Sequence, residues 1–251
     1  MLLQKFDFAF LITLKMNIMK TIILIVCISA SILSFGQVTD IGTINMVTYD
    51  MRQLNDFRDE FRMKKVLDPD SAVLSGTPYL NPVYSPGQFV TGDNKTFVDI
   101  PLRYNVYSDN FEFERANESL ILDPGKYALR VTLNDDLFIY TAYPVPGGTR
   151  NGYLEVLVEG NVTLYKRHKI IYEPPKPEAA YQDAQPGRFR EVSPDYYLRI
   201  GEGELSDIPT EKALLDLFYE HSDEIKSHIK KAKLKFRKEE DLIGIIEFVN
   251  K

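Results

Sequence analysis

The side chains of this chain that could do acid–base or metal chemistry are few and scattered. Its three histidines are His168, His221 and His228. His221 and His228 would share a face of a continuous helix, but a helix break is expected at Ser222, and a metal site needs three or four converging ligands. The chain holds no Gly-x-Ser-x-Gly, His-Glu-x-x-His or phosphate-loop pattern. We therefore assign no catalytic residue, no metal ligand and no cofactor.

A pair of carboxylates offers the next kind of chemistry. Glu112 and Glu114 lie two residues apart on an expected strand, so both would point to one face, about 7 Å apart. Glycosidases use two carboxyl groups at ~5–9.5 Å. Phenylalanines alternate with these glutamates, however, and that alternation is typical of a sheet with one solvated face. We interpret the pair as surface residues. A hydrolase acting on glycan or peptide, through a carboxylate pair not recognisable from sequence, is the alternative function.

Residues suited to contact rather than catalysis are more abundant. Thirteen of the fifteen tyrosines fall between Tyr79 and Tyr197, where aromatic side chains favour pleated, half-buried strands. We predict a contact surface on this sheet, with Tyr104, Tyr107 and Tyr140 as its candidate binding residues.

A second candidate contact surface lies near the C-terminus, where basic residues crowd a short segment. Lys226, Lys230 and Lys233 would form one stripe on a helix. Such a stripe could contact anionic envelope lipid or an acidic partner. The alternative is a solvated face whose charge balances the acidic sheet.

The elements that must position these residues change character along the chain. Residues 37–75 form a polar lead-in, with helical spacing over 50–65. From 76 to 172, short runs alternate apolar and polar residues and are separated by Asn, Asp and Gly turns, which predicts an antiparallel sheet domain. Residues 173–188 are rich in proline and indicate a connector.

The last part, 189–251, reads as one more hairpin and three short helices. The hairpin would turn at Ser193–Asp195; Thr210 and Ser222 would cap the first two helices, and the third would start near Lys238. The predicted fold class is α+β: a mainly antiparallel sheet, as a meander or an open barrel or sandwich, followed by a small helical segment.

The N-terminal residues 1–36 have the pattern of an extension and a secretory signal peptide. A charged start is followed by the apolar run Thr21–Leu33 and by small residues at 34 and 36. We predict cleavage between Gly36 and Gln37 and export to the periplasm, the cell surface or the medium. The start of translation, Met1, Met16 or Met19, stays open. No transmembrane helix is expected in 37–251, since no apolar run there reaches ~20 residues.

The composition of the exported chain excludes some kinds of chemistry and some kinds of partner. Cys27 is the single cysteine and lies inside the signal, so neither disulfides nor thiolate chemistry are expected after cleavage. The full chain has a net charge of −6, and loss of residues 1–36, with three lysines and one aspartate, makes the exported chain more acidic, so nucleic acid is not expected as a partner.

Four segments carry a resemblance to known proteins: Gly76–Leu80, Pro101–Asp109, Tyr196–Ile200 and Lys235–Leu242. Together they resemble a group of uncharacterised exported proteins of Bacteroidota. The resemblance implies a β-rich body with a short helical C-terminal tail and an exported location. It implies no activity and no catalytic residue. The sequence therefore predicts an exported non-enzymatic interaction or envelope-associated module, whose protein or envelope partner is unknown.

Overall fold

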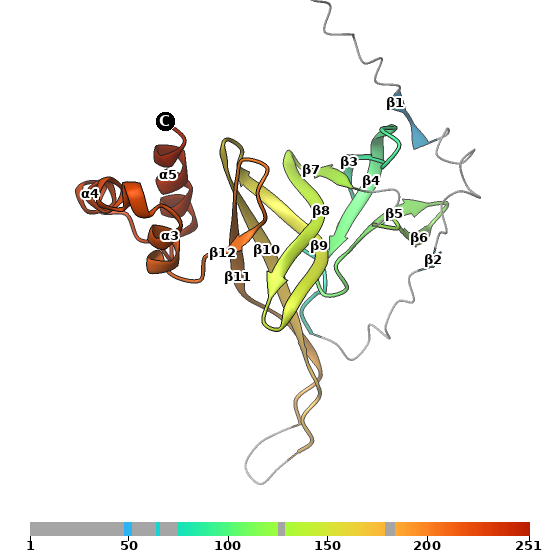
Figure 1. The fold of residues 1–251 in the computed structure, drawn as a ribbon. Helices are drawn as coiled ribbons and strands as arrows, with labels where there is room; N and C mark the ends of the chain where they lie inside the picture. The colour runs from blue at the N-terminus through green and yellow to red at the C-terminus, as the bar shows by residue number, and fades with distance from the viewer. Residues whose placement is uncertain (1–47, 52–63, 66–74, 125–128, 179–183) are drawn as a thin grey trace, which may run out of the picture. The chain divides into compact units, whose positions relative to one another are not determined.

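The structure is a computed structural model that describes residues 48–51, 64–65, 75–124, 129–178 and 184–251. All of them belong to the second of two units of the chain, Val47–Lys251. They form one twelve-stranded sheet and a group of short helices (Figure 1). The strands are β1 (Thr48–Tyr49), β2 (Lys64–Lys65), β3 (Ser85–Val90), β4 (Thr96–Asn105), β5 (Asn110–Arg115), β6 (Glu118–Ile121), β7 (Arg130–Leu133), β8 (Asp136–Val145), β9 (Gly148–Val158), β10 (Val162–Glu173), β11 (Arg188–Ile200) and β12 (Ser206–Asp207). The helices are α3 (Glu211–Leu217), the 3-10 turn η2 (Tyr219–His221), α4 (Ser222–Ala232) and α5 (Glu239–Val249).

The strand order confirms the predicted fold class of an antiparallel sheet with a helical tail. It runs β12-β11-β10-β9-β8-β7-β3-β4-β5-β6-β2, and β1 pairs in parallel with β4. Most neighbours are consecutive hairpins, as in a meander. Two steps are exceptions: β7 returns to pair with β3 rather than with β6, and β2 pairs with β6.

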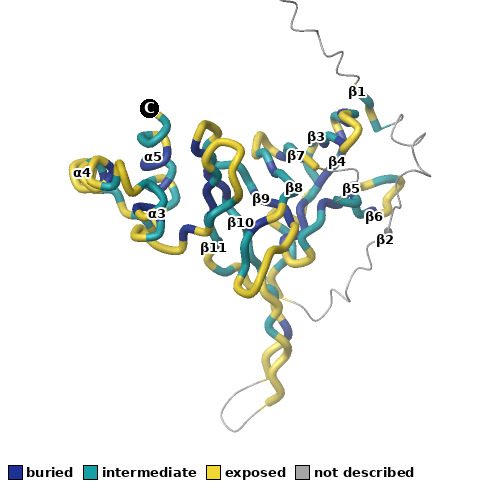
Figure 2. The backbone as a smooth tube through the Cα atoms, viewed as in Figure 1, coloured by how far each residue is buried: buried dark blue, intermediate teal, exposed yellow. Residues whose placement is uncertain are grey.

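The main core lies among the aromatic side chains of the central strands. Tyr104 stacks on Phe111 with ring centroids 4.7 Å apart, and Phe138 and Tyr153 pack against Phe111 edge-on. Their burial explains the period of two, because alternate residues of each strand face this core. Figure 2 shows such buried positions along the strands.

The β4–β5 turn is tied to strand β9 through the side chain of Asp109. This residue has φ 56°, a left-handed conformation that Asp adopts more readily than most residues. The backbone N–H of Tyr153 on β9 donates to Asp109 Oδ1 at 3.2 Å. In the sheet order β8, β7 and β3 lie between β9 and β4, so this hydrogen bond requires the sheet to curve.

The hairpin predicted to turn at Ser193–Asp195 is wrong. β11 continues through these residues and pairs with β10 from Arg188 to Ile200. The register shifts between Arg167 and Lys169, so that two residues of β11 face one of β10. Such a bulge accommodates Pro194, which has no N–H to give to a regular ladder.

The Pro-rich stretch 173–188 therefore does not connect two bodies. Its described residues continue the β10–β11 hairpin, and Lys176 and Gln185 exchange two backbone hydrogen bonds of 2.9 Å. β11 belongs to the same sheet as the strands of 76–172, so the predicted boundary near 189 does not separate two sheets.

The helices pack on the β9–β11 part of the sheet through one apolar cluster. Leu242, Ile245 and Ile246 of α5 are buried in it together with Val162 and Leu164 of β10. Thr210 caps α3 as predicted, since its hydroxyl accepts from the Ala213 N–H at 3.2 Å. Ser222 does not cap α4, because η2 leads directly into that helix and His221 takes the cap position.

Two predictions concern residues outside the described part. The signal segment 1–36 lies there entirely, and so does 52–63, which is most of the helix predicted over 50–65. Lys64–Lys65 at the end of that range pair with β6 as strand β2, so the helix does not include them.

Candidate functional site

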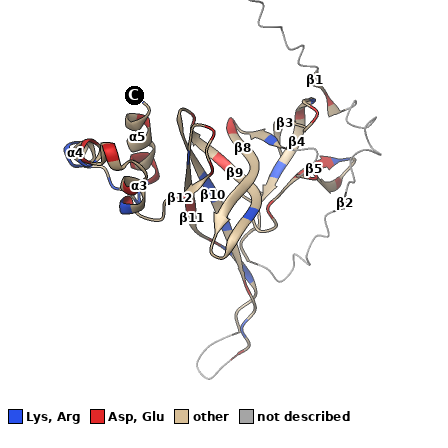
Figure 3. Ribbon diagram, viewed as in Figure 1, with Lys and Arg blue, Asp and Glu red and all other residues tan. Residues whose placement is uncertain are grey.

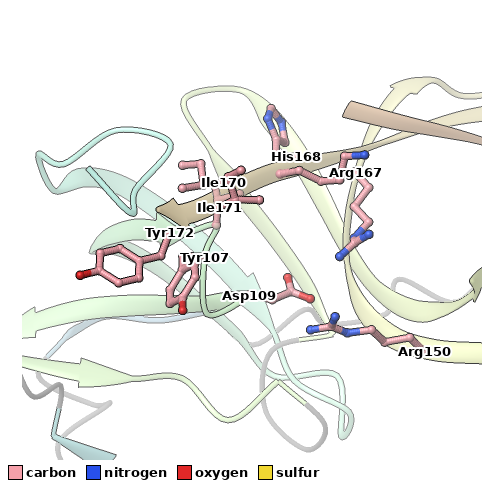
Figure 4. Close-up of a pocket in the computed structure, with 10 residues that line it drawn as sticks. Tyr107, Asp109, Arg150, Arg167, His168, Ile170, Ile171 and Tyr172 are labelled. Carbon is pink, nitrogen blue, oxygen red and sulfur yellow. The ribbon is translucent and has the colours of Figure 1, made fainter. Parts of the chain in front are cut away.

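A pocket of about 380 Å³ opens between the β4–β5 turn and strands β9 and β10. Its charged residues are Asp109 from the turn, Arg150 from β9, and Arg167, His168 and Lys169 from β10 (Figure 4). Its apolar lining is supplied by Val106, Tyr107, Ile170, Ile171 and Tyr172. Charged and apolar residues in one concave site are typical of a small-molecule pocket.

Asp109 is held in a fixed position by two donors to one carboxylate oxygen. The Tyr104 hydroxyl donates to Oδ1 at 2.7 Å, and the Tyr153 N–H donates to the same atom. Burial raises the pKa of Asp109 above its ordinary value, while these hydrogen bonds and the charges of Arg150 and Arg167 act in the opposite direction. Both donors bind Oδ1, so Oδ2 is the remaining oxygen of this carboxylate.

Gly152 makes room for that oxygen. A Cβ at this position would collide with Asp109 Oδ2 and would come within 3.2 Å of the Tyr143 hydroxyl oxygen. The Tyr143 hydroxyl is buried and has no hydrogen-bond partner in the described part of the chain. A buried hydroxyl without a partner costs about 1–3 kcal/mol, so this corner is not optimised for stability alone.

The cations around Asp109 are only partly neutralised. Arg167 Nη1 lies 3.3 Å and Lys169 Nζ 2.6 Å from the Asp195 carboxylate. Arg150 forms no ion pair with any described residue, and Figure 4 shows its guanidinium and that of Arg167 pointing toward Asp109. Three cations thus face two carboxylates, an excess of one positive charge in a chain whose net charge is −6.

The apolar wall is built on Phe189. Tyr107 and Tyr172 both pack against this ring, with centroids 5.2 Å and 5.3 Å from it. The Tyr107 side chain remains 51% exposed and that of Tyr172 38% exposed. Two tyrosines that are held in place but still open to solvent give the pocket a rigid aromatic surface.

His168 is already engaged by another partner. Its Nε2 lies 2.5 Å from Glu155 Oε2, and in Figure 4 its ring points away from Asp109. Lys166, near Glu155, pairs with Glu239 of α5 at 2.8 Å, and the Tyr196 hydroxyl donates to Glu239. We assign His168 to this network, which joins the sheet to the helices.

The structure separates the three tyrosines that were predicted to form a contact surface. Tyr107 lines the pocket. Tyr104 is only 2% exposed and positions Asp109, so its prediction as a contact residue is wrong. It is buried because it shares the inward face of β4 with Leu102. Tyr140 is half-buried and packs on Tyr153 at 5.2 Å.

The three lysines of the predicted basic stripe are exposed: Lys226 and Lys230 lie on α4, and Lys233 directly follows it. Figure 3 shows basic residues on this helix. Lys226 lies 3.4 Å from Asp223, and Lys233 ends the helix in a left-handed conformation with φ 56°. None of the three lines the pocket. They are therefore a separate feature of the surface.

The interpretation of Glu112 as a solvated residue is wrong. It is 1% exposed, and Arg103 Nη2 lies 2.7 Å from its Oε2. The Arg103 guanidinium lies over the rings of Tyr79 and Tyr84, at 3.9 Å and 4.4 Å from their centroids. Arg103 is directly opposite Glu112 in the β4–β5 ladder. Pairing the two strands around their turn would have found this ion pair from sequence.

Sequence reasoning missed Asp109, Arg150 and Arg167 as a group. The local pattern around Asp109 indicates a turn, and no motif in the sequence points to either arginine. They come from three elements that only the curvature of the sheet brings together.

No protein-family model matches the chain, and neither a curated protein nor a solved structure shows significant similarity to it. Within the described ranges, His, Asp and Glu form no cluster of three or more that could hold a metal ion. None of the described helices is long and apolar enough to cross a membrane.

Proposed function

We propose that this chain is an exported binding protein, not an enzyme, and that its pocket holds an anionic group of the ligand. The observation that carries this proposal is the unpaired Arg150 beside Arg167 and the fixed Asp109. An arginine fork binds carboxylate or phosphate through two parallel hydrogen bonds. A pocket with excess positive charge in an acidic chain attracts anions and not cations.

The alternative of a hydrolase finds less support at this site. A glycosidase needs one carboxyl group as acid and a second as base or nucleophile. Among the described residues that line the pocket, Asp109 supplies one carboxyl group and no second acid accompanies it. His168 turns toward Glu155 and away from Asp109.

The proposal is tested by the double variant Arg150→Gln, Arg167→Gln in the full chain. Sulfate and acetate, as simple anionic probes, should raise the Tm of the unchanged protein, because a ligand that binds only the folded state stabilises it. The double variant should lose this effect. Lys226→Gln, Lys230→Gln removes two charges outside the pocket and should keep it. Equal stabilisation of all three proteins would contradict an anion site here.

Export is supported by the charged, apolar and small-residue pattern of residues 20–36. The N-terminal sequence of the protein purified from its own cells should begin at Gln37. A cell-associated form that keeps Met19 and Lys20 would contradict cleavage at this place.

The exposed lysines of α4 support a weaker, second contact with anionic surfaces, about 1 kcal/mol for each lysine near the membrane. Replacing Lys226, Lys230 and Lys233 by glutamine should reduce binding to vesicles that contain phosphatidylglycerol, and added salt should reduce the binding of the unchanged protein. Unchanged binding of the triple variant would remove this contact.

A further inference from the structure

The pocket offers an acceptor as well as donors, and this constrains the ligand beyond its charge. A site built for an anion alone would gain nothing from Asp109, whose carboxylate repels that anion. Two donors occupy Oδ1, whereas Oδ2 lies against Gly152, at the place that a Cβ there would fill. Because Asp109 lines the pocket, Oδ2 is the oxygen left to accept from a ligand. The ligand therefore needs a hydrogen-bond donor next to its anionic group.

The donor is better supplied by a hydroxyl group than by an ammonium group. An ammonium group that reached Asp109 would also lie near Arg150 and Arg167, whose guanidinium groups point to the same carboxylate. Like charges at such a separation repel. A hydroxyl group donates to Asp109 without this repulsion. This argues against a free amino acid and for a hydroxylated acid.

The aromatic wall adds a requirement for shape. Tyr107 and Tyr172 present apolar ring surface on the side of the pocket away from the arginines in Figure 4. Their hydroxyl groups also provide donors and acceptors at the rim. A saturated ring with an apolar face and several hydroxyl groups matches such a wall, because tyrosine combines an apolar body with a polar tip.

From these three features we infer that the pocket binds an acidic sugar, with a hexuronate unit as its simplest form. The sugar carboxylate pairs with Arg150 and Arg167, a ring hydroxyl donates to Asp109, and the ring lies against Tyr107. This inference rests on the proposed function and specifies its ligand class.

The test is a comparison of four probes by calorimetric titration of the full chain. Methyl β-D-glucuronide carries both the carboxylate and the hydroxyl groups. Methyl β-D-glucoside lacks the carboxylate, cyclohexanecarboxylate lacks the hydroxyl groups, and phenylalanine replaces them by an ammonium group. The glucuronide should bind at least tenfold more tightly than each of the other three.

The variant Asp109→Asn sharpens the comparison. If the asparagine oxygen keeps the two donors of Oδ1, its NH₂ group takes the place of Oδ2 and presents a donor where the sugar needs an acceptor. Affinity for the glucuronide should fall at least tenfold, whereas that for cyclohexanecarboxylate should not fall, because a negative charge has been removed. Tyr107→Ala changes an exposed side chain. It should weaken the binding of the glucuronide and of cyclohexanecarboxylate and leave sulfate binding unchanged.

The outcomes separate this inference from the proposed function. Binding of sulfate and of cyclohexanecarboxylate as tight as that of the glucuronide would overturn the sugar ligand and leave an anion site. Tighter binding of phenylalanine would overturn it in favour of a zwitterion. Equal binding of glucoside and glucuronide, with no effect of sulfate, would remove the anion site as well.

Discussion

Two of the described clusters that combine arginine with a carboxylate are arranged in opposite ways. In the cluster of Arg103 and Glu112, the arginine donates to Glu112 and to the Tyr79 hydroxyl, and Asn105 donates to the other Glu112 oxygen at 3.1 Å. In the open cluster of Asp109, Arg150 and Arg167, the carboxylate is fixed by neutral donors and both arginines line a pocket. Arg167 is paired with Asp195, so Arg150 is the arginine that the contrast concerns.

This difference separates a charge that stabilises the fold from a charge that is available to a ligand. A buried charge is tolerated in a fold when every donor and acceptor is satisfied, and removing one partner is then costly. A charge that is positioned but not satisfied contributes little to stability and stays available to a ligand. Glu112 and Asp109 both belong to the β4–β5 hairpin, so the hairpin alone does not explain the contrast.

The largest effect is expected in the closed cluster, which is the one of Arg103 and Glu112. Glu112→Ala leaves the Arg103 charge buried without its partner and should lower the free energy of unfolding by about 3–5 kcal/mol. Arg150→Ala, in the open cluster, should change it by no more than about 0.5 kcal/mol. Urea unfolding monitored by circular dichroism measures both. Similar losses in the free energy of unfolding for the two variants would contradict the distinction between the two clusters.

Gly152→Ala should disturb the open cluster by steric clash, without changing any charge. The added methyl group collides with Asp109 Oδ2, so the carboxylate must move. Overpacking of this kind costs about 1–3 kcal/mol, and binding of the glucuronide should weaken at least tenfold.

Gly244→Ala is the matched control for this substitution. A Cβ on Gly244 in α5 meets nothing within 4 Å, and alanine should stabilise the helix by about 0.5–1 kcal/mol. Its ligand affinity should not change. If Gly152→Ala behaved in the same way, the close approach of Asp109 to β9 would be refuted.

The smallest expected effect is a pH dependence. Because burial raises the folded-state pKa of Asp109, the folded protein holds its proton longer than the unfolded chain does. The burial of Asp109 therefore lowers stability as the pH rises above its ordinary pKa of 3.8.

Asp109→Asn removes this cost. The stability of the variant relative to the unchanged protein should increase between pH 4 and pH 7, as measured by urea unfolding at both values. A change in the opposite direction would mean that the carboxylate is better stabilised in the fold than in water.

The sequence could predict the sheet but not the site. Alternating apolar residues and Asn, Asp and Gly turns indicated the antiparallel strands, because these patterns are local. The bulge opposite His168 was missed, since Pro194 stops a regular strand in sequence and only the register with β10 shows that the strand goes on. Tyr104 was wrongly predicted as a contact residue, because the alternation of residues does not show which face of a strand packs on the core.

The pocket depends on non-local geometry. Arg150 and Arg167 lie on neighbouring strands, but Asp109 reaches them only because the sheet curves enough for the Tyr153 N–H to bind it. The spacing of residues along the chain does not predict how strongly the sheet curves. The local pattern at Asp109 indicates a turn and nothing more.

The central claim is that the open cluster binds a ligand and the closed cluster does not. The most direct measurement is an NMR titration of the ¹⁵N-labelled full chain with methyl β-D-glucuronide. We expect the largest amide shifts at Asp109, Arg150, Tyr153 and Arg167, and no shift of the Arg103 and Glu112 amides. Shifts centred on Arg103 and Glu112, or none around Asp109 at saturating probe, would contradict it.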